Sequence, residues 1–411
     1  MQLYEPQRHE ATSSADWNEA VARTVIARIA ADAQRVFCAE RLWPIHPFDI
    51  SPERPSAMKP LYYGAAGVIW ALDELVRRGA ISTGPAYAAT VAELTLRHHD
   101  DLRANAAADD YLGRELASYL MGDAGMLMLS WKLQPSSEVA AQIYSLLQQK
   151  AGDTRGVLWG AAGSMVAALL MHKMTGEARW VEIFIRHFDA LWDRWTWVDE
   201  PGCWAWVAEL YGDTETRLGA LHGFVANAYA MVRGAHLLPI ERRDAALDRI
   251  EQTLQRTALR DGGLANWPHR VGASNRAESM PLLMQFCSGA PGVVACMAGL
   301  RDGGSCPSFD ALLLEAGELV WRAGPTTKFP VLCHGVVGAG YAFLKLYART
   351  GDARWLARAR AFAMHGIDRA ARALEQYGQR KYSLWTGDLG LAVFLWDCVQ
   401  GNAQLPTLDV F

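Results

Sequence analysis

Three side chains that commonly bind zinc lie in two similar segments of the chain. Cys287 stands two residues before Gly289, and Cys333 and His334 directly precede Gly335. Two thiolates and one imidazole are the protein ligands of a catalytic zinc whose fourth position stays open for water or substrate. A structural zinc would require a fourth protein ligand, and the chain has no close-spaced Cys-x-x-Cys pair. The residues therefore predict an open zinc site.

Both segments belong to an internal repeat. Two glycines three residues apart, followed by an apolar run, occur six times, beginning at Gly64, Gly122, Gly160, Gly289, Gly335 and Gly387. A seventh copy keeps Gly223 and has Ala226 in place of the second glycine. Glycine lacks a Cβ, so neighbouring helix ends can approach closely and the entering turn can adopt unusual backbone angles.

The apolar runs lack a polar stripe, whereas segments between them, such as 240–259 and 354–372, are amphipathic. Buried helices therefore alternate with surface helices. We expect an all-α protein, an α/α toroid (double-layer barrel) of seven inner and seven outer helices. The N-termini of the inner helices, with their free N–H groups, should meet at one functional face.

Length and composition agree with one repeat domain over residues 1–411, in which 1–60 form an opening helix, from Trp17 to Arg41, and a proline-rich lead-in. A net charge of -4 gives no electrostatic basis for nucleic-acid binding. No run approaches the roughly 18 apolar residues of a transmembrane segment, and the N-terminus has no signal-peptide pattern. The seven cysteines, an odd number, favour a reducing compartment, and we expect a cytoplasmic protein.

These motifs together resemble those of the lanthionine cyclase (LanC-like) family, and more closely its eukaryotic-type, glutathione-transferring members. The resemblance covers nearly the whole chain and is carried by the glycine repeats, by His222-Gly223, by Cys287-Ser288-Gly289-Ala290-Pro291-Gly292 and by Cys333-His334-Gly335. It implies a toroid of fourteen helices and a Zn²⁺ ion held by two cysteines and one histidine. It also implies addition of a thiol to dehydroalanine or dehydrobutyrine.

That chemistry assigns roles to two further residues. A free thiol has a pKa of about 8.5, and coordination to zinc removes its proton. Attack on the dehydroamino acid produces an enolate, whose α-carbon must then be protonated. His222, which matches the histidine of the family motif, is predicted to be that acid, or alternatively to accept the thiol proton. Lys328, by its place in the LanC-like pattern, is predicted to stabilise the enolate or to bind a glutathione carboxylate.

The chain departs from the family pattern at two positions. Lantibiotic cyclases have an aspartate where this chain has Gly156, so no catalytic carboxylate is assigned. The residue after the first zinc cysteine is usually tyrosine or histidine in the family, and here it is Ser288. Both differences affect the predicted proton-transfer partners.

Three functions remain open. The preferred one is a zinc-dependent enzyme that forms a thioether between a dehydrated peptide or protein and either the peptide's own cysteine or glutathione. It would depend on a separate dehydratase or kinase/lyase. The second is a non-catalytic zinc- and glutathione-binding scaffold or regulator. The third, a carbohydrate-active enzyme on a similar toroid, requires a carboxylate pair, and the only acidic residues at repeat starts are Asp123 and Asp388.

Overall fold

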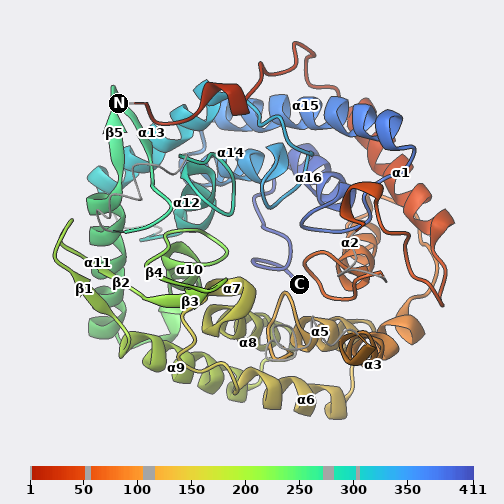
Figure 1. Cartoon of the computed structure of the whole chain (residues 1–411), viewed down its shortest axis with the longest axis horizontal. Coiled ribbons are helices and arrows are strands. Elements are labelled where there is room, and N and C mark those ends of the chain that lie inside the picture. The colour runs from red at the N-terminus through yellow and green to blue at the C-terminus, as the bar shows by residue number, and fades with distance from the viewer. Residues whose placement is uncertain (1, 51–56, 105–115, 272–281, 302–305) are drawn as a thin grey trace.

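The computed structural model describes residues 2–50, 57–104, 116–271, 282–301 and 306–411. Seven helices in this part of the chain begin directly after the first glycine of a repeat, as predicted. They are α2 (Ala65–Arg77), α5 (Asp123–Leu133), α8 (Ala161–Thr175), α10 (Phe224–Gly234), α12 (Ala290–Met297), α14 (Val336–Thr350) and α16 (Asp388–Gln400). They form the inner layer of a ring (Figure 1).

The glycine pairs are explained by the loop that precedes each inner helix. At the second glycine of all six intact pairs, a Cβ would lie 1.9–2.5 Å from the carbonyl oxygen six residues earlier. At Gly292 and Gly338 it would also lie 2.8 Å from a Cβ of the preceding repeat, that of Ala220 or Phe286. The close approach expected from the sequence is therefore present, and most of the space is taken by each repeat's own loop.

Seven amphipathic helices form the outer layer (Figure 1). They are α1 (Glu19–Val36), α3 (Ala88–Ala104), α6 (Ser137–Leu147), α9 (Ala178–Trp192), α11 (Ile240–Thr257), α13 (Pro307–Ala323) and α15 (Ala353–Tyr377). The short helix α7 (Gly156–Trp159) precedes α8. Helix α1 packs against α16, which joins the two ends of the ring. The predicted α/α toroid is confirmed.

The opening helix is shorter than the predicted span from Trp17 to Arg41. It begins after Asn18, whose side chain accepts a hydrogen bond from the amide of Val21 at 3.1 Å and so caps the first turn. It ends at Phe37, where the backbone turns to extended angles. The lead-in that follows contains a 3₁₀ turn, Pro47–Asp49.

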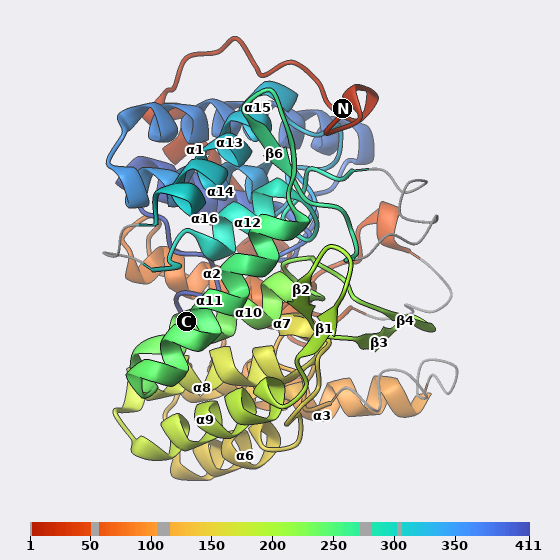
Figure 2. The same ribbon diagram turned by 90° about the vertical axis from the view of Figure 1, so that its left-hand side faces the viewer.

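Three β-hairpins, which the sequence analysis did not predict, lie in the described connections from outer helices to the inner helices that follow them. They pair β1 (Thr196–Val198) with β2 (Cys203–Ala205), β3 (Ala208–Leu210) with β4 (Asp213–Glu215), and β5 (Leu259–Asp261) with β6 (Leu264–Asn266). The β3–β4 hairpin projects from one face of the ring (Figure 2). The tryptophans around β1 and β2 pack on one another and on Arg249, with the Trp195 and Trp206 rings 3.7 Å apart. We therefore assign this cluster to packing.

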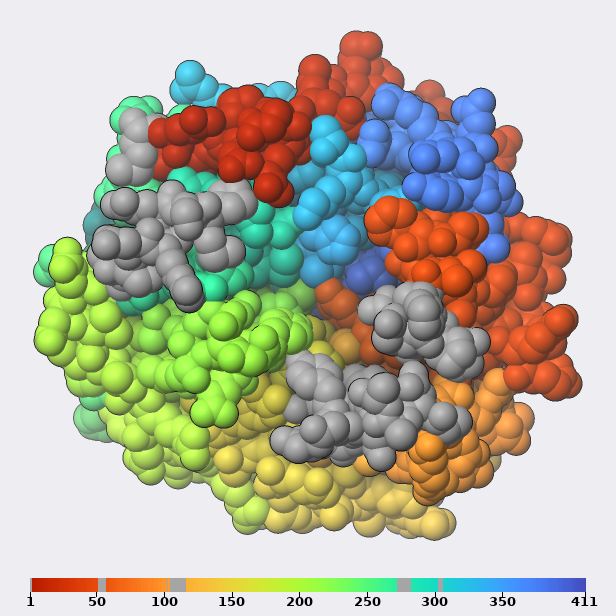
Figure 3. Space-filling model, in the orientation of Figure 1, coloured from red at the N-terminus to blue at the C-terminus, as the bar shows by residue number. Residues whose placement is uncertain are grey.

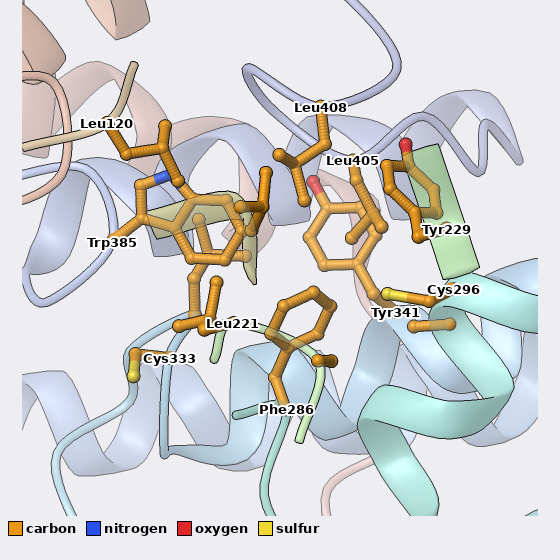
Figure 4. Packing of buried hydrophobic residues seen from close by; sticks show 14 of the residues in the cluster. Leu120, Leu221, Tyr229, Phe286, Cys296, Cys333, Tyr341, Trp385, Leu405 and Leu408 are labelled. Carbon is orange, nitrogen blue, oxygen red and sulfur yellow. The ribbon is translucent and has the colours of Figure 1, made fainter. Parts of the chain in front are cut away.

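The C-terminal segment fills the middle of the ring (Figure 1). Leu405 and Leu408 lie among buried side chains of the inner helices, including Tyr229 and Tyr341 (Figure 4). Asp409 is buried there, where it accepts a hydrogen bond from the Tyr229 hydroxyl at 2.7 Å and pairs with Lys345 Nζ at 2.6 Å. Across the described residues, no helix combines the length and the apolar character needed to cross a membrane.

Candidate active site

One residue of each repeat, two positions before its first glycine, lies on a circle at the N-terminal ends of the inner helices. These mouth residues are Tyr62, Leu120, Leu158, Leu221, Cys287, Cys333 and Trp385. At five of their seven junctions a backbone amide donates to the carbonyl of the next mouth residue: Tyr62 to Leu120 (3.0 Å), Leu158 to Leu221 (3.2 Å), Cys287 to Cys333 (3.0 Å), Cys333 to Trp385 (3.0 Å) and Trp385 to Tyr62 (3.0 Å). The repeat therefore brings the two cysteines together.

The two thiols interact directly. The hydrogen bond with the Cys287 thiol, together with those from His334 and the Tyr62 hydroxyl, lowers the pKa of Cys333 well below the usual range for a thiol. The same contact with Cys333, followed by burial, raises the pKa of Cys287. Cys333 is thus the thiol that ionises first. Figure 4 shows its sulfur at the edge of the apolar core.

The predicted ligand set is brought together around Cys333, which contacts both Cys287 and His334. These contacts are pairwise: within the described ranges, no three His, Cys, Asp or Glu side chains are arranged as a complete metal site. The donor chemistry nevertheless fits Zn²⁺, since two adjacent sulfurs and an imidazole are its preferred soft and borderline ligands. Tyr62, a mouth residue that the sequence analysis missed, would orient the Cys333 sulfur through the hydrogen bond of its hydroxyl.

His222 and His334 line the same cavity, of about 620 Å³. Figure 3 shows a hollow near the middle of the same face as Figure 1, between the blue atoms of the C-terminal third and the orange atoms of the lead-in. Burial, and then the charge of Arg217, lowers the pKa of His222 to about 4, so its imidazole is neutral near pH 7. The buried Nδ1 atom of His222 makes no hydrogen bond to any described residue. A neutral ring with an unbonded nitrogen suits a proton acceptor.

Gly156 has no space for a side chain. Its φ is +80°, and a Cβ there would lie 2.5 Å from the Leu221 carbonyl oxygen and 2.9 Å from the His222 Cα. A side chain at this position, such as the aspartate expected from the family pattern, is therefore excluded by the Leu221 carbonyl oxygen and the Cα of His222. The aromatic residue beside His222 is Tyr211, from the β3–β4 hairpin, with ring centroids 5.8 Å apart at 83°.

Ser288 contacts His269, which in turn contacts Arg217. Its hydroxyl lies 3.3 Å from Nδ1 of His269, and Nε2 of His269 lies 3.2 Å from Nη1 of Arg217. Because a guanidinium only donates, Nε2 must accept, and the neutral ring therefore carries its hydrogen on Nδ1 and donates to Ser288. These contacts join distant segments, and nothing within the chain's local pattern links residue 269 to 217 or 288.

Lys328 lies close to the cysteines. Its Nζ donates to Oε1 of Gln285 at 2.8 Å, and its charge acts to lower the pKa of Cys287, against the larger opposing effects of Cys333 and burial. It also lines a second cavity, of about 480 Å³, that reaches His334 and is bordered by Arg369 and Arg372. The predicted residue is thus part of a cationic pocket beside the candidate ligands.

Comparisons with known proteins identify the family of the chain. Residues 56–410 match the family described as lanthionine synthetase C-like protein. A relative from Danio rerio, glutathione S-transferase LANCL1, is 24% identical over 329 residues, which cover 73% of this chain and 78% of the relative. LanC-like protein GCL1 from Arabidopsis thaliana is 28% identical over 275 residues, 63% of this chain and 58% of that protein.

Among solved structures, nisin cyclase matches 94% of this chain and 100% of its own, with a TM-score of 0.56 and 13% sequence identity. At that identity the match concerns the fold, and it agrees with the toroid described above. The match of residues 56–410 covers most of the chain. The chain belongs to the lanthionine synthetase C-like protein family.

Proposed function

We propose that this protein is a zinc-dependent enzyme that adds a thiol to the β-carbon of a dehydroalanine or dehydrobutyrine residue in a peptide or protein, forming a thioether. The observation that supports it is the meeting of two cysteines and a histidine at Cys333, beside a cavity that a neutral, unbonded His222 also lines. Cys287, Cys333 and His334 would hold the zinc ion. When bound, Zn²⁺ supplies a lowered thiol pKa, so that a thiolate is available near neutral pH.

The chain's own residues would perform the remaining steps. His222 accepts the proton that the incoming thiol loses, because it is neutral near pH 7 and its Nδ1 has no other described partner. Tyr62 orients the Cys333 sulfur through its hydroxyl. The apolar and aromatic wall of the larger cavity, including Trp159 and Met121, excludes water from the reacting carbons.

The two cavities favour an intermolecular reaction with glutathione over ring closure. They have different chemistry, and His334 and Phe48 line both. Glutathione carries two carboxylates, which complement Lys328, Arg369 and Arg372 in the smaller cavity. The larger cavity, with its aromatic and apolar lining, suits the dehydrated residue and its neighbours. A separate dehydratase, or a kinase and lyase, would supply that residue by elimination from serine or threonine.

The direct test is incubation of the zinc-loaded protein with glutathione and a peptide containing dehydroalanine. We expect a mass increase of one glutathione per peptide, and its loss in Cys333→Ala. The matched control is Cys398→Ala, another fully buried cysteine that lies in α16. No adduct and no ring with any supplied thiol, despite bound zinc, would refute the enzyme.

A binding protein without turnover is the second candidate. The absence of a side chain at Gly156 and the small Ser288 favour it, because both positions lack the larger side chains that the family pattern has there. Glutathione binding measured by calorimetry, together with no adduct after prolonged incubation, would support this candidate over the enzyme.

A further inference from the structure

We propose that Tyr211 is the acid that protonates the α-carbon after thiol addition, and that it thereby fixes the configuration of the new centre. This inference rests on the proposed function. It concerns a residue of the β3–β4 hairpin, an element that the repeat pattern does not contain.

Tyr211 reaches the candidate active site from a segment that is not part of the repeat. It follows β3 directly, and its φ of +57° allows the tight turn into β4. Its ring meets the imidazole of His222 edge to face, with centroids 5.8 Å apart. Tyr211, His222 and His334 all line the larger cavity, so a phenol, a proton acceptor and a candidate ligand face one substrate.

Two neighbours of Tyr211 favour the phenolate that proton donation would leave, although burial has the larger effect on the phenol and raises its pKa. Trp159 Nε1 donates a hydrogen bond to the Tyr211 oxygen at 3.3 Å, and an indole N–H can only donate. The guanidinium carbon of Arg217 lies 5.7 Å from the centre of the Tyr211 ring. Glu215 holds Arg217 there through an ion pair of 3.1 Å. Burial raises the pKa of Tyr211, so the phenol is protonated near pH 7 before the reaction.

Every proton that moves in this reaction then comes from, and passes to, groups within the candidate active site. The incoming thiol gives its proton to His222, and its sulfur forms the bond to the β-carbon while the carbon–carbon π bond breaks. The electron pair moves into an enolate, and the α-carbon takes the phenolic proton of Tyr211. His222 returns the thiol proton to the phenolate of Tyr211. The net change is addition of S and H across the double bond, with both side chains restored.

Tyr62, Tyr63 and Tyr382 also line this cavity, and the Tyr382 hydroxyl donates to Asp32 at 2.7 Å. The contacts of Tyr62 assign it a different task. Its hydroxyl bonds to the thiol of Cys333, and the Tyr62 ring stacks on Trp385 at 5.9 Å. A hydroxyl committed to a candidate ligand positions that ligand. The position where the family pattern has an aspartate is Gly156, so no side chain there can act as the acid.

The test is Tyr211→Phe, which keeps the ring on His222 and removes only the hydroxyl. We expect kcat for adduct formation to fall about 10²- to 10⁴-fold with little change in KM and in zinc content. Chromatographic separation of the hydrolysed thioether diastereomers should give one configuration with the unmodified protein and a mixture with Tyr211→Phe. The matched control is Tyr144→Phe, whose ring also meets an aromatic ring, Trp180, edge to face at 5.9 Å.

A second variant keeps the inference testable if Tyr211→Phe folds poorly. Trp159→Phe removes the donor to the Tyr211 oxygen, and we expect kcat to fall about 10-fold while one configuration is retained. Unchanged rate and configuration in Tyr211→Phe, with an active unmodified protein, would overturn this inference alone. An unmodified protein that forms no adduct would overturn the proposed function together with it. A mixed product from Tyr62→Phe and not from Tyr211→Phe would assign the acid to Tyr62 instead.

Discussion

The backbone amide of Cys287 donates a 3.0 Å hydrogen bond to the carbonyl oxygen of Cys333. The two residues are far apart in sequence, and they occupy the same position in consecutive copies of the repeat. The bond therefore fixes the separation of the two thiols through the backbone, independently of what the sulfur atoms bind.

The hydroxyl of Tyr62 should contribute to metal affinity. Tyr62→Phe removes the hydrogen bond to Cys333 and leaves the ring stacked on Trp385. We expect zinc affinity to fall about 10-fold or more, because groups that orient a ligand typically contribute that much. Competition with a zinc chelator measures it. Tyr382→Phe serves as a control, since its hydroxyl bonds instead to Asp32 at 2.7 Å; an equal loss in both variants would contradict the prediction.

Gly289 should not tolerate a side chain. Its φ is +102°, and a Cβ would lie 1.9 Å from the Leu283 carbonyl oxygen. We expect Gly289→Ala to lower the free energy of unfolding by about 3 kcal/mol, from backbone strain and overpacking together. Denaturant titration measures the change. Gly299→Ala, where a Cβ meets nothing within 4 Å, should cost less than about 1 kcal/mol, and a similar loss at both positions would show that the contact is unimportant.

The buried Asp409 carboxylate should stabilise the fold because two cations depend on it as their partner. Asp409 pairs with Lys345 at 2.6 Å and with Arg233 at 3.3 Å inside the ring. Asp409→Ala leaves two cations without their carboxylate, and we expect a loss of about 3–5 kcal/mol in unfolding free energy. The exposed pair Arg179–Glu177 provides the comparison, where Arg179→Ala should cost less than about 1 kcal/mol. A loss below that level at Asp409 would mean that solvent reaches the cluster.

His98 should make stability depend on pH. Burial lowers the pKa of His98 from 6.5 to about 4, so the folded state binds this proton less readily than the unfolded state. The stability associated with this lowered pKa is fully present above pH 6.5 and is lost as the pH falls toward 4. At pH 5 the free energy of unfolding is lower by about 2 kcal/mol. His98→Gln should therefore lose less stability between pH 7 and pH 5 than the unmodified protein. His236→Gln, at an exposed histidine, should not differ from the unmodified protein, and an unchanged pH profile in His98→Gln would disprove the assignment.

Lys328 should recognise the charge of the thiol substrate. Lys328→Gln removes one cation from the pocket that also contains Arg369 and Arg372. We expect KM for glutathione to rise about 10-fold, equivalent to about 1.4 kcal/mol, with a smaller effect on kcat. Glutathione diethyl ester, which lacks both carboxylates, should show no difference between the two proteins. A fall in kcat alone would instead favour the enolate-stabilising role of Lys328.

Features that follow from the repeat, such as the starts of the inner helices, could be predicted from the sequence. Glycine pairs mark the starts of the inner helices because backbone contact excludes a Cβ, and this local requirement is visible in the residue types. The same register would have identified Tyr62, which stands two residues before Gly64 as Cys287 stands before Gly289.

The sequence could not predict what lies outside the repeat. Tyr211 reaches the candidate active site from a hairpin, and His269 meets Ser288 and Arg217 through contacts between distant segments. Such contacts depend on how the ring closes, and they produce no periodic pattern in the sequence. The hairpins themselves are formed by strands of three residues, too short to give a clear alternating pattern in the sequence.

The circle of mouth residues also limits how the protein can vary. In an open solenoid, a repeat can be gained or lost with only its two neighbours affected. Here backbone hydrogen bonds join five of the seven pairs of neighbouring mouth residues, and the bond from Trp385 to Tyr62 closes the circle, so removing one helical pair would interrupt the circle that holds Cys287 beside Cys333. Closure of the circle therefore constrains the number of copies, and we expect natural insertions to accumulate in the connecting hairpins and loops instead.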